Sequence, residues 1–194
     1  KLAAGGWFPL AVGVGVFLIM TTWWRGRYEL RRTMETGSMP DDIFLMDIKA
    51  NPPPRVAGTA VFMTSGTSGI PNVLLHHLKH NKVLHEQVVL LSIVVQGVPF
   101  AVGNQSLAVH PIGDDVGFYR VVANVGFMQQ PNVPRILSRC ERRGLKAAPS
   151  DTTYYLGRQT LLTSGAARMA RWRKMLFSFL SRNARPPTSF YGLP

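Results

Sequence analysis

The chain of 194 residues is poor in cysteine and in acidic residues, and each low count restricts the classes of function that it can have. Its single cysteine, Cys140, excludes an internal disulfide, which suits a reducing cytosol. Ten acidic residues stand against 22 lysines and arginines, so the formal net charge is +12. The cations gather after the first apolar stretch, in residues 135–146 and in residues 168–185. This distribution suits a domain held beneath an anionic lipid leaflet.

Sequence patterns that carry catalysis are also missing. The chain has no G-x-S-x-G elbow, no H-E-x-x-H pattern and no cysteine–histidine pair at a known spacing. Asp114 and Asp115 are adjacent in a turn, where acids are common for conformational reasons. We therefore expect that the protein is not an enzyme. Nucleic acid is not an expected partner, because no recognition motif or set of stacking aromatic residues accompanies the positive charge.

Charge is absent from Leu2 to Trp24, and this is the most informative feature of the chain. A helix of these 23 residues rises about 34 Å, enough to cross a hydrocarbon core of roughly 30 Å. Aromatic and cationic residues close the stretch, as is typical of a cytoplasmic membrane–water interface. We expect a transmembrane helix over 1–24, with these interface residues: Trp23, Trp24, Arg25, Arg27, Arg31 and Arg32.

Two alternatives compete with a membrane span. A signal peptide has a shorter apolar core and a small-residue cleavage site, but this run ends in Thr-Thr-Trp-Trp at residues 21–24. A buried core helix rarely stays uncharged over such a length. Because the chain begins directly at this span, we expect it to be the tail end of a larger membrane protein.

Residues 25–54 are expected to link the span to a cytosolic domain. Residues 25–36 continue as a polar helix, and residues 39–49 predict a second, short helix. The prolines at 52–54 then end any helix, so we place the domain boundary there. The cytosolic domain is accordingly expected to cover residues 55–194.

The pattern of this domain predicts an α/β fold with a mixed sheet of about five strands and about three packed helices. Strand 59–64, helix 72–84 and strand 86–96 predict a right-handed βαβ unit with parallel strands. Further strands are expected at 106–112, 118–125 and 152–156, the first two as an antiparallel hairpin.

Two more helices are expected, at 131–143 and 165–183. Asn132 is the expected N-cap of the first and Gly144 its stop. The second is basic and amphipathic. Docking on the domain's own sheet is the favoured interpretation, and binding to a membrane interface or a partner is the alternative.

Ser65, Gly66, Thr67, Ser68 and Gly69 form the loop between the first expected strand and helix 72–84. Free backbone amides in such a loop hold phosphates in nucleotide-binding proteins. These residues are therefore our candidate site for a small regulatory nucleotide. The absence of G-x-x-x-x-G-K-[ST] and G-x-G-x-x-G favours an ordinary flexible loop instead.

His76 and His80 lie four residues apart on the same expected helix and are the candidate metal ligands. A zinc site needs a third ligand and supporting partners, and no cysteine is near. Histidines that form hydrogen bonds or lie on a solvated face are the favoured interpretation. We expect no metal and no cofactor in this chain.

Several stretches resemble the Kup-type (KUP/HAK/KT) potassium uptake permeases, in the same order along the chain. GGWFPLAVGVGVFLIMTTWWRGR is similar to the last membrane helix of that family, and RVAGTAVFMTSGTSGIPNVLLHHLKHNKVLHEQVVLLSI to the start of its cytosolic domain. YRVVANVGFMQQPNVPRIL, TTYYLGRQTL and WRKMLFSFLSRNARPPTSFYGLP follow the same pattern. Ala57 stands where the family more often has proline, and the chain stops at Pro194 where the family usually has a short tail.

The resemblance implies the C-terminal part of a potassium–proton symporter in a bacterial inner membrane, with its domain in the cytoplasm. Potassium and protons would be the transported species, at sites in earlier spans outside this chain. The implied partners are the lipid bilayer, the remaining membrane domain and a second copy in a homodimer. The cytosolic domain would be structural or regulatory. The alternative is a membrane-tethered regulatory domain that senses a nucleotide.

Overall fold

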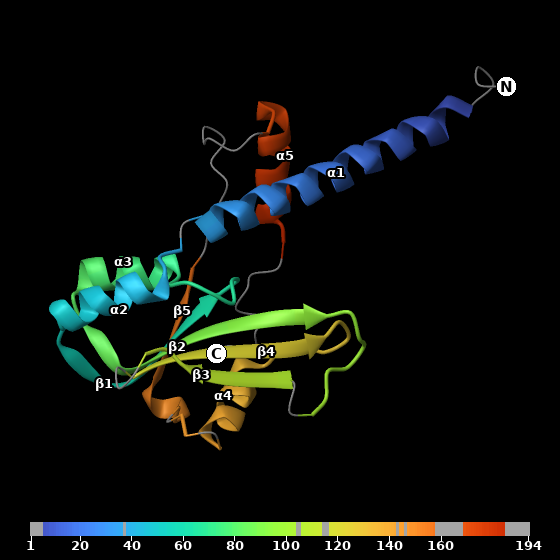
Figure 1. Ribbon diagram of the computed structural model, residues 1–194. Coiled ribbons are helices and arrows are strands. Elements are labelled where there is room, and N and C mark those ends of the chain that lie inside the picture. Colours follow the sequence, from blue (N-terminus) through green and yellow to red (C-terminus); the bar gives the residue numbers. More distant parts are fainter. Residues whose placement is uncertain are drawn as a thin grey trace. The chain divides into compact units, whose positions relative to one another are not determined.

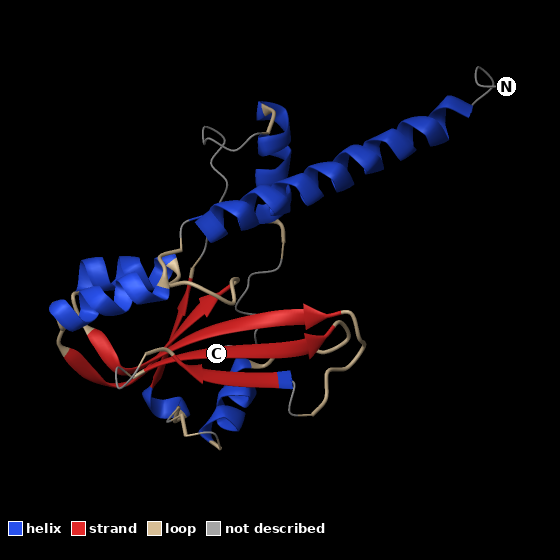
Figure 2. Cartoon of the chain, in the orientation of Figure 1, coloured by secondary structure: helices blue, strands red, loops and turns tan. Residues whose placement is uncertain are grey.

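The computed structural model describes residues 6–36, 38–103, 106–113, 117–142, 144–145, 147–157 and 169–184. The chain divides into two compact units, which are described separately (Figures 1 and 2). The helical unit consists of Lys1–Thr33 and Gln159–Ala184. The sheet unit consists of Met34–Arg158 and Arg185–Pro194.

The helix α1, Trp7–Thr36, dominates the helical unit. Its segment Trp7–Arg32 is long and apolar enough to cross a membrane. The predicted span and the predicted polar helix that follows it therefore form one continuous helix. Its large apolar side chains are mostly exposed rather than packed in a core, among them Trp7, Phe8, Leu10, Phe17 and Met20.

The second helix of this unit, α5 (Arg171–Arg182), packs against α1. The ring of Phe177 lies 5.4 Å from that of Trp23, centroid to centroid. A Cβ atom on Gly26 would collide with the same Phe177 ring, so glycine permits the close approach. The sequence favoured docking of this helix on the sheet, but the structure groups it with α1. The expected first turn, 165–168, lies outside the described residues.

The sheet has five strands, as predicted, and their order is β3-β4-β2-β1-β5. They are β1 (Arg55–Thr64), β2 (Leu84–Gln96), β3 (Leu107–Pro111), β4 (Phe118–Gly126) and β5 (Thr152–Leu156). β2 pairs in parallel with β1 and β4, and β1 with β5, whereas β3 runs antiparallel to β4. The predicted βαβ unit and hairpin are therefore confirmed.

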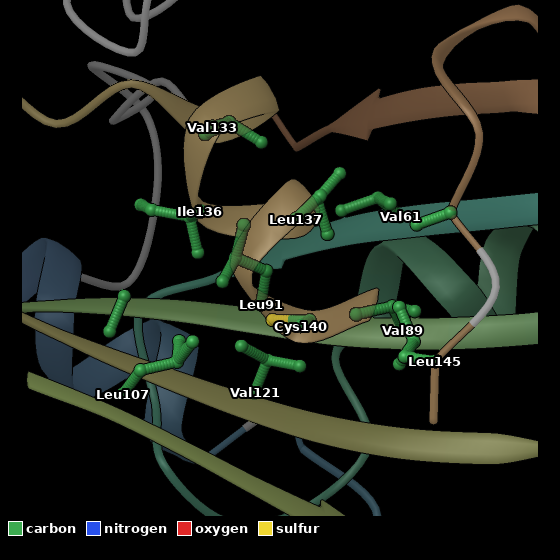
Figure 3. Close-up of a cluster of buried hydrophobic side chains, with 12 residues drawn as sticks. Val61, Val89, Leu91, Leu107, Val121, Val133, Ile136, Leu137, Cys140 and Leu145 are labelled. Carbon is green, nitrogen blue, oxygen red and sulfur yellow. The ribbon is translucent and has the colours of Figure 1, made fainter. Parts of the chain in front are cut away.

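One face of the sheet is covered by α4, Val133–Glu141 (Figure 3). Val61, Val89, Leu91 and Val121 point to this face, where they pack with one side of α4. The side chain of Asn132 accepts a hydrogen bond from the Arg135 amide at 2.9 Å, which confirms the predicted N-cap. A short 3-10 helix, Pro149–Asp151, precedes β5.

The opposite face is covered by α2 (Asp41–Ala50) and α3 (Asn72–Asn81). Phe62 and Leu90 contribute to this second core because successive side chains of a strand alternate between faces. Phe44 and Ile48 of α2 belong to it as well, at 1% and 3% exposure. The expected division after residue 54 thus separates α2 from the core that it completes.

Candidate functional site

The candidate ligand loop, Ser65–Gly69, connects the carboxyl end of β1 to α3. Its first part is fixed to two strands. The amide of Gly66 donates to the hydroxyl of Thr64 at 3.3 Å, and the hydroxyl of Ser92 on β2 donates to the carbonyl of Gly66 at 2.5 Å. The loop therefore has a defined backbone path rather than the freedom of an unattached connection.

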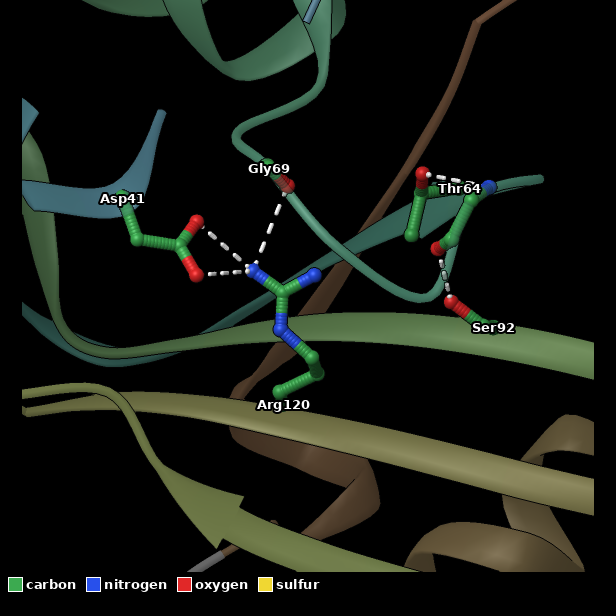
Figure 4. Close-up of polar contacts among 6 residues, drawn as sticks. Asp41, Thr64, Gly69, Ser92 and Arg120 are labelled. Atoms are coloured by element: carbon green, nitrogen blue, oxygen red, sulfur yellow. Dashed lines mark hydrogen bonds and ion pairs between the residues drawn. The ribbon is translucent and has the colours of Figure 1, made fainter. Parts of the chain in front are cut away.

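Arg120 holds the far end of the loop. Its side chain extends from β4 toward Asp41 of α2 and Gly69 of the loop (Figure 4). Its Nη2 donates to the carbonyl of Gly69 at 3.2 Å. The same nitrogen donates to both carboxylate oxygens of Asp41, at 2.8 and 3.0 Å. Arg120 thus joins the loop, the sheet and the first turn of α2.

The other terminal nitrogen of Arg120, Nη1, is buried and has no hydrogen-bond partner among the described residues. In Figure 4 it points away from Asp41. The Arg120 side chain is 9% exposed, so a cationic nitrogen lies in a region from which water is largely excluded. A buried charged donor without a partner is costly. An anionic or carbonyl oxygen placed there would satisfy it.

The backbone of the loop needs glycine at position 69. Gly69 has φ +73°, and a Cβ atom there would lie 3.0 Å from the side chain of Ser38. The neighbouring Ile70 forms a two-way backbone bridge with Met39, at 2.7 and 3.2 Å. The segment before α2 therefore lies directly against the end of the loop.

His76 and His80 lie together, as their spacing predicts, with stacked rings whose centroids are 6.1 Å apart. Both side chains are exposed. Among the described residues, no group of three or more histidine, cysteine or carboxylate side chains converges on a common point. The pair therefore has no third protein ligand in this part of the chain, and a metal site there stays a prediction.

A second pair of histidines, which the sequence did not single out, lies beside Tyr155: His77 is buried and His85 is half-buried. The rings of His77 and His85 are 6.4 Å apart, and the His77 ring lies 4.7 Å from that of Tyr155. Nε2 of His77 and Nδ1 of His85 are buried, and neither has a hydrogen-bond partner in the part of the chain that the structure describes. Nδ1 of His77 lies 3.0 Å from Nδ2 of Asn81.

This environment favours neutral imidazoles. Burial lowers the pKa of His77, and the nearby backbone of Val83 opposes the effect only in part. Burial also lowers the pKa of His85, and the nearby His77 lowers it further. The spacing of apolar residues predicts which side of α3 is buried. His77 falls on that side together with Leu74, so this pattern could have identified it.

All six predicted interface residues lie on α1. Trp24 is 70% exposed and stacks on Tyr28, whereas Trp23 is half-buried beside α5. The four cations of the set are exposed, namely Arg25, Arg27, Arg31 and Arg32. Aromatic rings and cations therefore share one short stretch of an exposed helix, the arrangement expected where a span leaves the membrane.

Comparison with known proteins agrees with the resemblance. The model of the family "K+ potassium transporter C-terminal domain" matches residues 57–194. A "Probable potassium transport system protein Kup" of Anaeromyxobacter sp. (strain Fw109-5) is 49% identical over all of this chain, which covers 30% of that relative. A Kup 1 protein of Geobacter sulfurreducens is 47% identical, with 31% of its length covered. No solved structure matches.

The chain spans about three tenths of the length of these relatives. Its similarity to them runs over its whole length, the apolar helix included. The family match and this identity together show that the chain belongs to the potassium transporter C-terminal domain family, as the C-terminal region of a Kup-type transporter.

Proposed function

We propose that this chain is the last membrane span and the cytoplasmic domain of a potassium–proton symporter in a bacterial inner membrane. The observation that carries the proposal is the exposed apolar surface of α1. Only 6% of its most apolar window is buried. A helix with this surface is stable in hydrocarbon and unfavourable in water. The relatives bear the names of potassium transport proteins.

The ion path lies, in this proposal, in spans that this chain does not contain. Among the described residues, no three histidine, cysteine or carboxylate side chains converge on a common point, and acidic residues are few in the sequence. The sheet unit then supports folding or regulates transport, and it catalyses no reaction. The net charge of +12 on the chain favours a position beside the anionic cytoplasmic leaflet.

Proton coupling is tested with the whole transporter in vesicles that contain a pH-sensitive dye. Inward potassium movement should acidify the lumen when no other proton path is present. Potassium uptake without any pH change in the lumen would reject symport but leave potassium transport standing. Orientation is tested by labelling Trp24→Cys in intact cells, where a reagent that cannot cross the membrane should fail to react.

A second candidate function is regulation by a small nucleotide at loop Ser65–Gly69. The unpartnered Nη1 of Arg120 favours it, because a buried cationic donor beside a βα loop would bind a phosphate oxygen. Calorimetry of the chain against adenine nucleotides and cyclic dinucleotides tests it. Binding that is lost in Arg120→Lys and kept in Arg139→Gln, a change of an exposed arginine, would support it. If none of these nucleotides binds, this second candidate function is rejected.

We also propose that the protein forms a homodimer, and that the loops after β2 and β4 contribute to its contact. The two loops are joined by a hydrogen bond from the Phe127 amide to the Val98 carbonyl, at 3.0 Å. They expose several large apolar side chains: Val98, Phe100, Val102, Phe127 and Met128. Disulfide trapping of Val102→Cys in membranes should give a covalent dimer, and Met46→Cys, at an exposed position of α2, should not.

A further inference from the structure

The helix α5 divides into a buried side and an exposed apolar side. Phe177 is 3% exposed and meets α1. Trp172, Met175 and Phe179 are 51%, 63% and 64% exposed. Their spacing of three and four residues places these three side chains in one stripe along the helix. The stripe is therefore an apolar surface that packing against α1 leaves uncovered.

Cations flank this stripe on both sides. By helical geometry, Arg171 and Arg182 lie along one edge and Arg173 along the other. The Arg173 guanidinium carbon lies 5.2 Å from the centroid of the Trp172 ring. Arg171–Arg182 contains no acidic residue. An anionic lipid leaflet has an apolar interior of acyl chains beneath a layer of anionic headgroups. An apolar stripe between cations matches this chemistry, because the stripe can contact the acyl chains while the cations contact the headgroups.

The contact with α1 also fixes the position of α5 along that helix. Phe177 lies against Trp23 and Gly26, and the exposed Trp24 is the residue of α1 that follows Trp23. Figure 1 shows α5 beside α1. Tryptophans at the end of a membrane span lie at the level of the lipid headgroups. The helix α5 is therefore attached to α1 at the level where an amphipathic helix binds a membrane.

We propose that α5 is an interfacial helix, whose stripe of Trp172, Met175 and Phe179 enters the cytoplasmic leaflet at the headgroup–acyl boundary. Its arginines then meet anionic headgroups, and α5 fixes the depth and rotation of α1. The inference rests on the proposed function, because it requires α1 to cross the same membrane. It adds a lipid-binding surface at the C-terminal end of the cytosolic chain, more than 130 residues after the span.

The test uses the full chain in phosphatidylcholine vesicles with about 30 mol% phosphatidylglycerol, an anionic lipid. An environment-sensitive fluorophore is placed on Met175→Cys, and quenching by lipid spin-labelled near the carbonyl end of its acyl chain is measured. Phe17→Cys reports on the span, and Met46→Cys, at an exposed position of α2, is the matched control. Cys140 is fully buried, so the new surface cysteine is labelled first.

We expect a blue shift and strong quenching at positions 175 and 17, and neither at 46. The exchange of Trp172 and Phe179 for serine should abolish quenching at 175 while helix content stays unchanged, because both side chains are exposed. Vesicles without anionic lipid should give weaker quenching.

Quenching at 17 without quenching at 175 would overturn this inference and leave the proposed function intact. A blue shift at 175 that follows protein density, without lipid quenching, would show that a second copy covers the stripe, and this too would overturn the inference. Loss of quenching at position 17 would instead reject the membrane span itself.

Discussion

Arg120 and Asp41 form an ion pair between residues 79 positions apart, with Nη2 of the arginine 2.8 Å from a carboxylate oxygen. The pair joins strand β4 to the first turn of α2. Asp41 also favours that turn, because the amino end of a helix carries partial positive charge. The same arginine nitrogen binds the Gly69 carbonyl, so one side chain organises the candidate ligand loop and the helix beside it.

Asp41→Asn should destabilise the sheet unit by about 1–2 kcal/mol, because it leaves a buried guanidinium without its anion. The Asp41 side chain is 31% exposed, so water moderates the loss. The free energy of unfolding is measured by denaturant titration in detergent. Asp42→Asn changes an exposed neighbour of the same type and should be close to neutral. Equal losses in the two variants would contradict the role given to this ion pair.

Gly69→Ala should cost about 1–2 kcal/mol, because an L-residue is unfavourable in a left-handed conformation. The new methyl group would also crowd Ser38. Gly66→Ala is the matched control in the same loop, since its Cβ would lie 3.4 Å from the carbonyl oxygen of Ser68, with φ outside the left-handed region. Thermal unfolding of the two variants should differ clearly, and similar midpoints would show that the loop is not constrained at position 69.

The buried histidines should make the sheet unit less stable in acid. Burial lowers the pKa of His77 and of His85 below the ordinary value of 6.5, so the unfolded chain binds protons more readily than the folded chain. Their contribution to stability is therefore full above about pH 6.5 and is lost as the pH falls below it. Unfolding titrations between about pH 5 and 8 measure how the free energy of unfolding changes with pH.

Replacing both histidines with glutamine should flatten this pH dependence. His110→Gln, at an exposed position on β3, should leave it unchanged. If the free energy of unfolding of the double variant still fell in acid, the groups that cause the pH dependence would lie elsewhere.

Gly26→Leu should detach α5 from α1, since Phe177 occupies the space of the added side chain. Distances between spin labels at Tyr28 and Met175, both exposed, should lengthen and broaden. Gly13→Leu adds the same side chain where no described residue lies within 4 Å of the Cβ position, and it should leave the distances unchanged. An unaltered distance in Gly26→Leu would contradict the packing of the two helices.

Local patterns in the sequence predicted most elements of the fold. The apolar run at residues 86–96 indicated a central strand, and β2 is indeed paired on both sides. Asn132 marked the start of α4 because a cap depends on neighbouring residues alone. The first strand was predicted four residues too short, since Arg55 and Val56 pair with Leu84 and His85 only through long-range contacts.

The parts that the sequence did not predict depend on packing between distant segments. Arg120 was the clearest feature that could have been recognised, because a single charged residue in an otherwise apolar strand requires a partner elsewhere in the chain. Its partner, Asp41, lies before the expected domain boundary and could not be identified from local pattern. The placement of α5 beside α1 was missed for the same reason, since an amphipathic helix shows that it has a partner without identifying it.

Potassium uptake tests the central claim most directly, in cells that lack their own potassium uptake systems. Two proteins are compared: this chain alone, and this chain joined to the preceding spans of the Geobacter sulfurreducens relative. The chain alone should support no uptake and no growth at low potassium, whereas the joined protein should support both. Uptake by the chain alone would contradict the account, because it would place an ion path within these 194 residues.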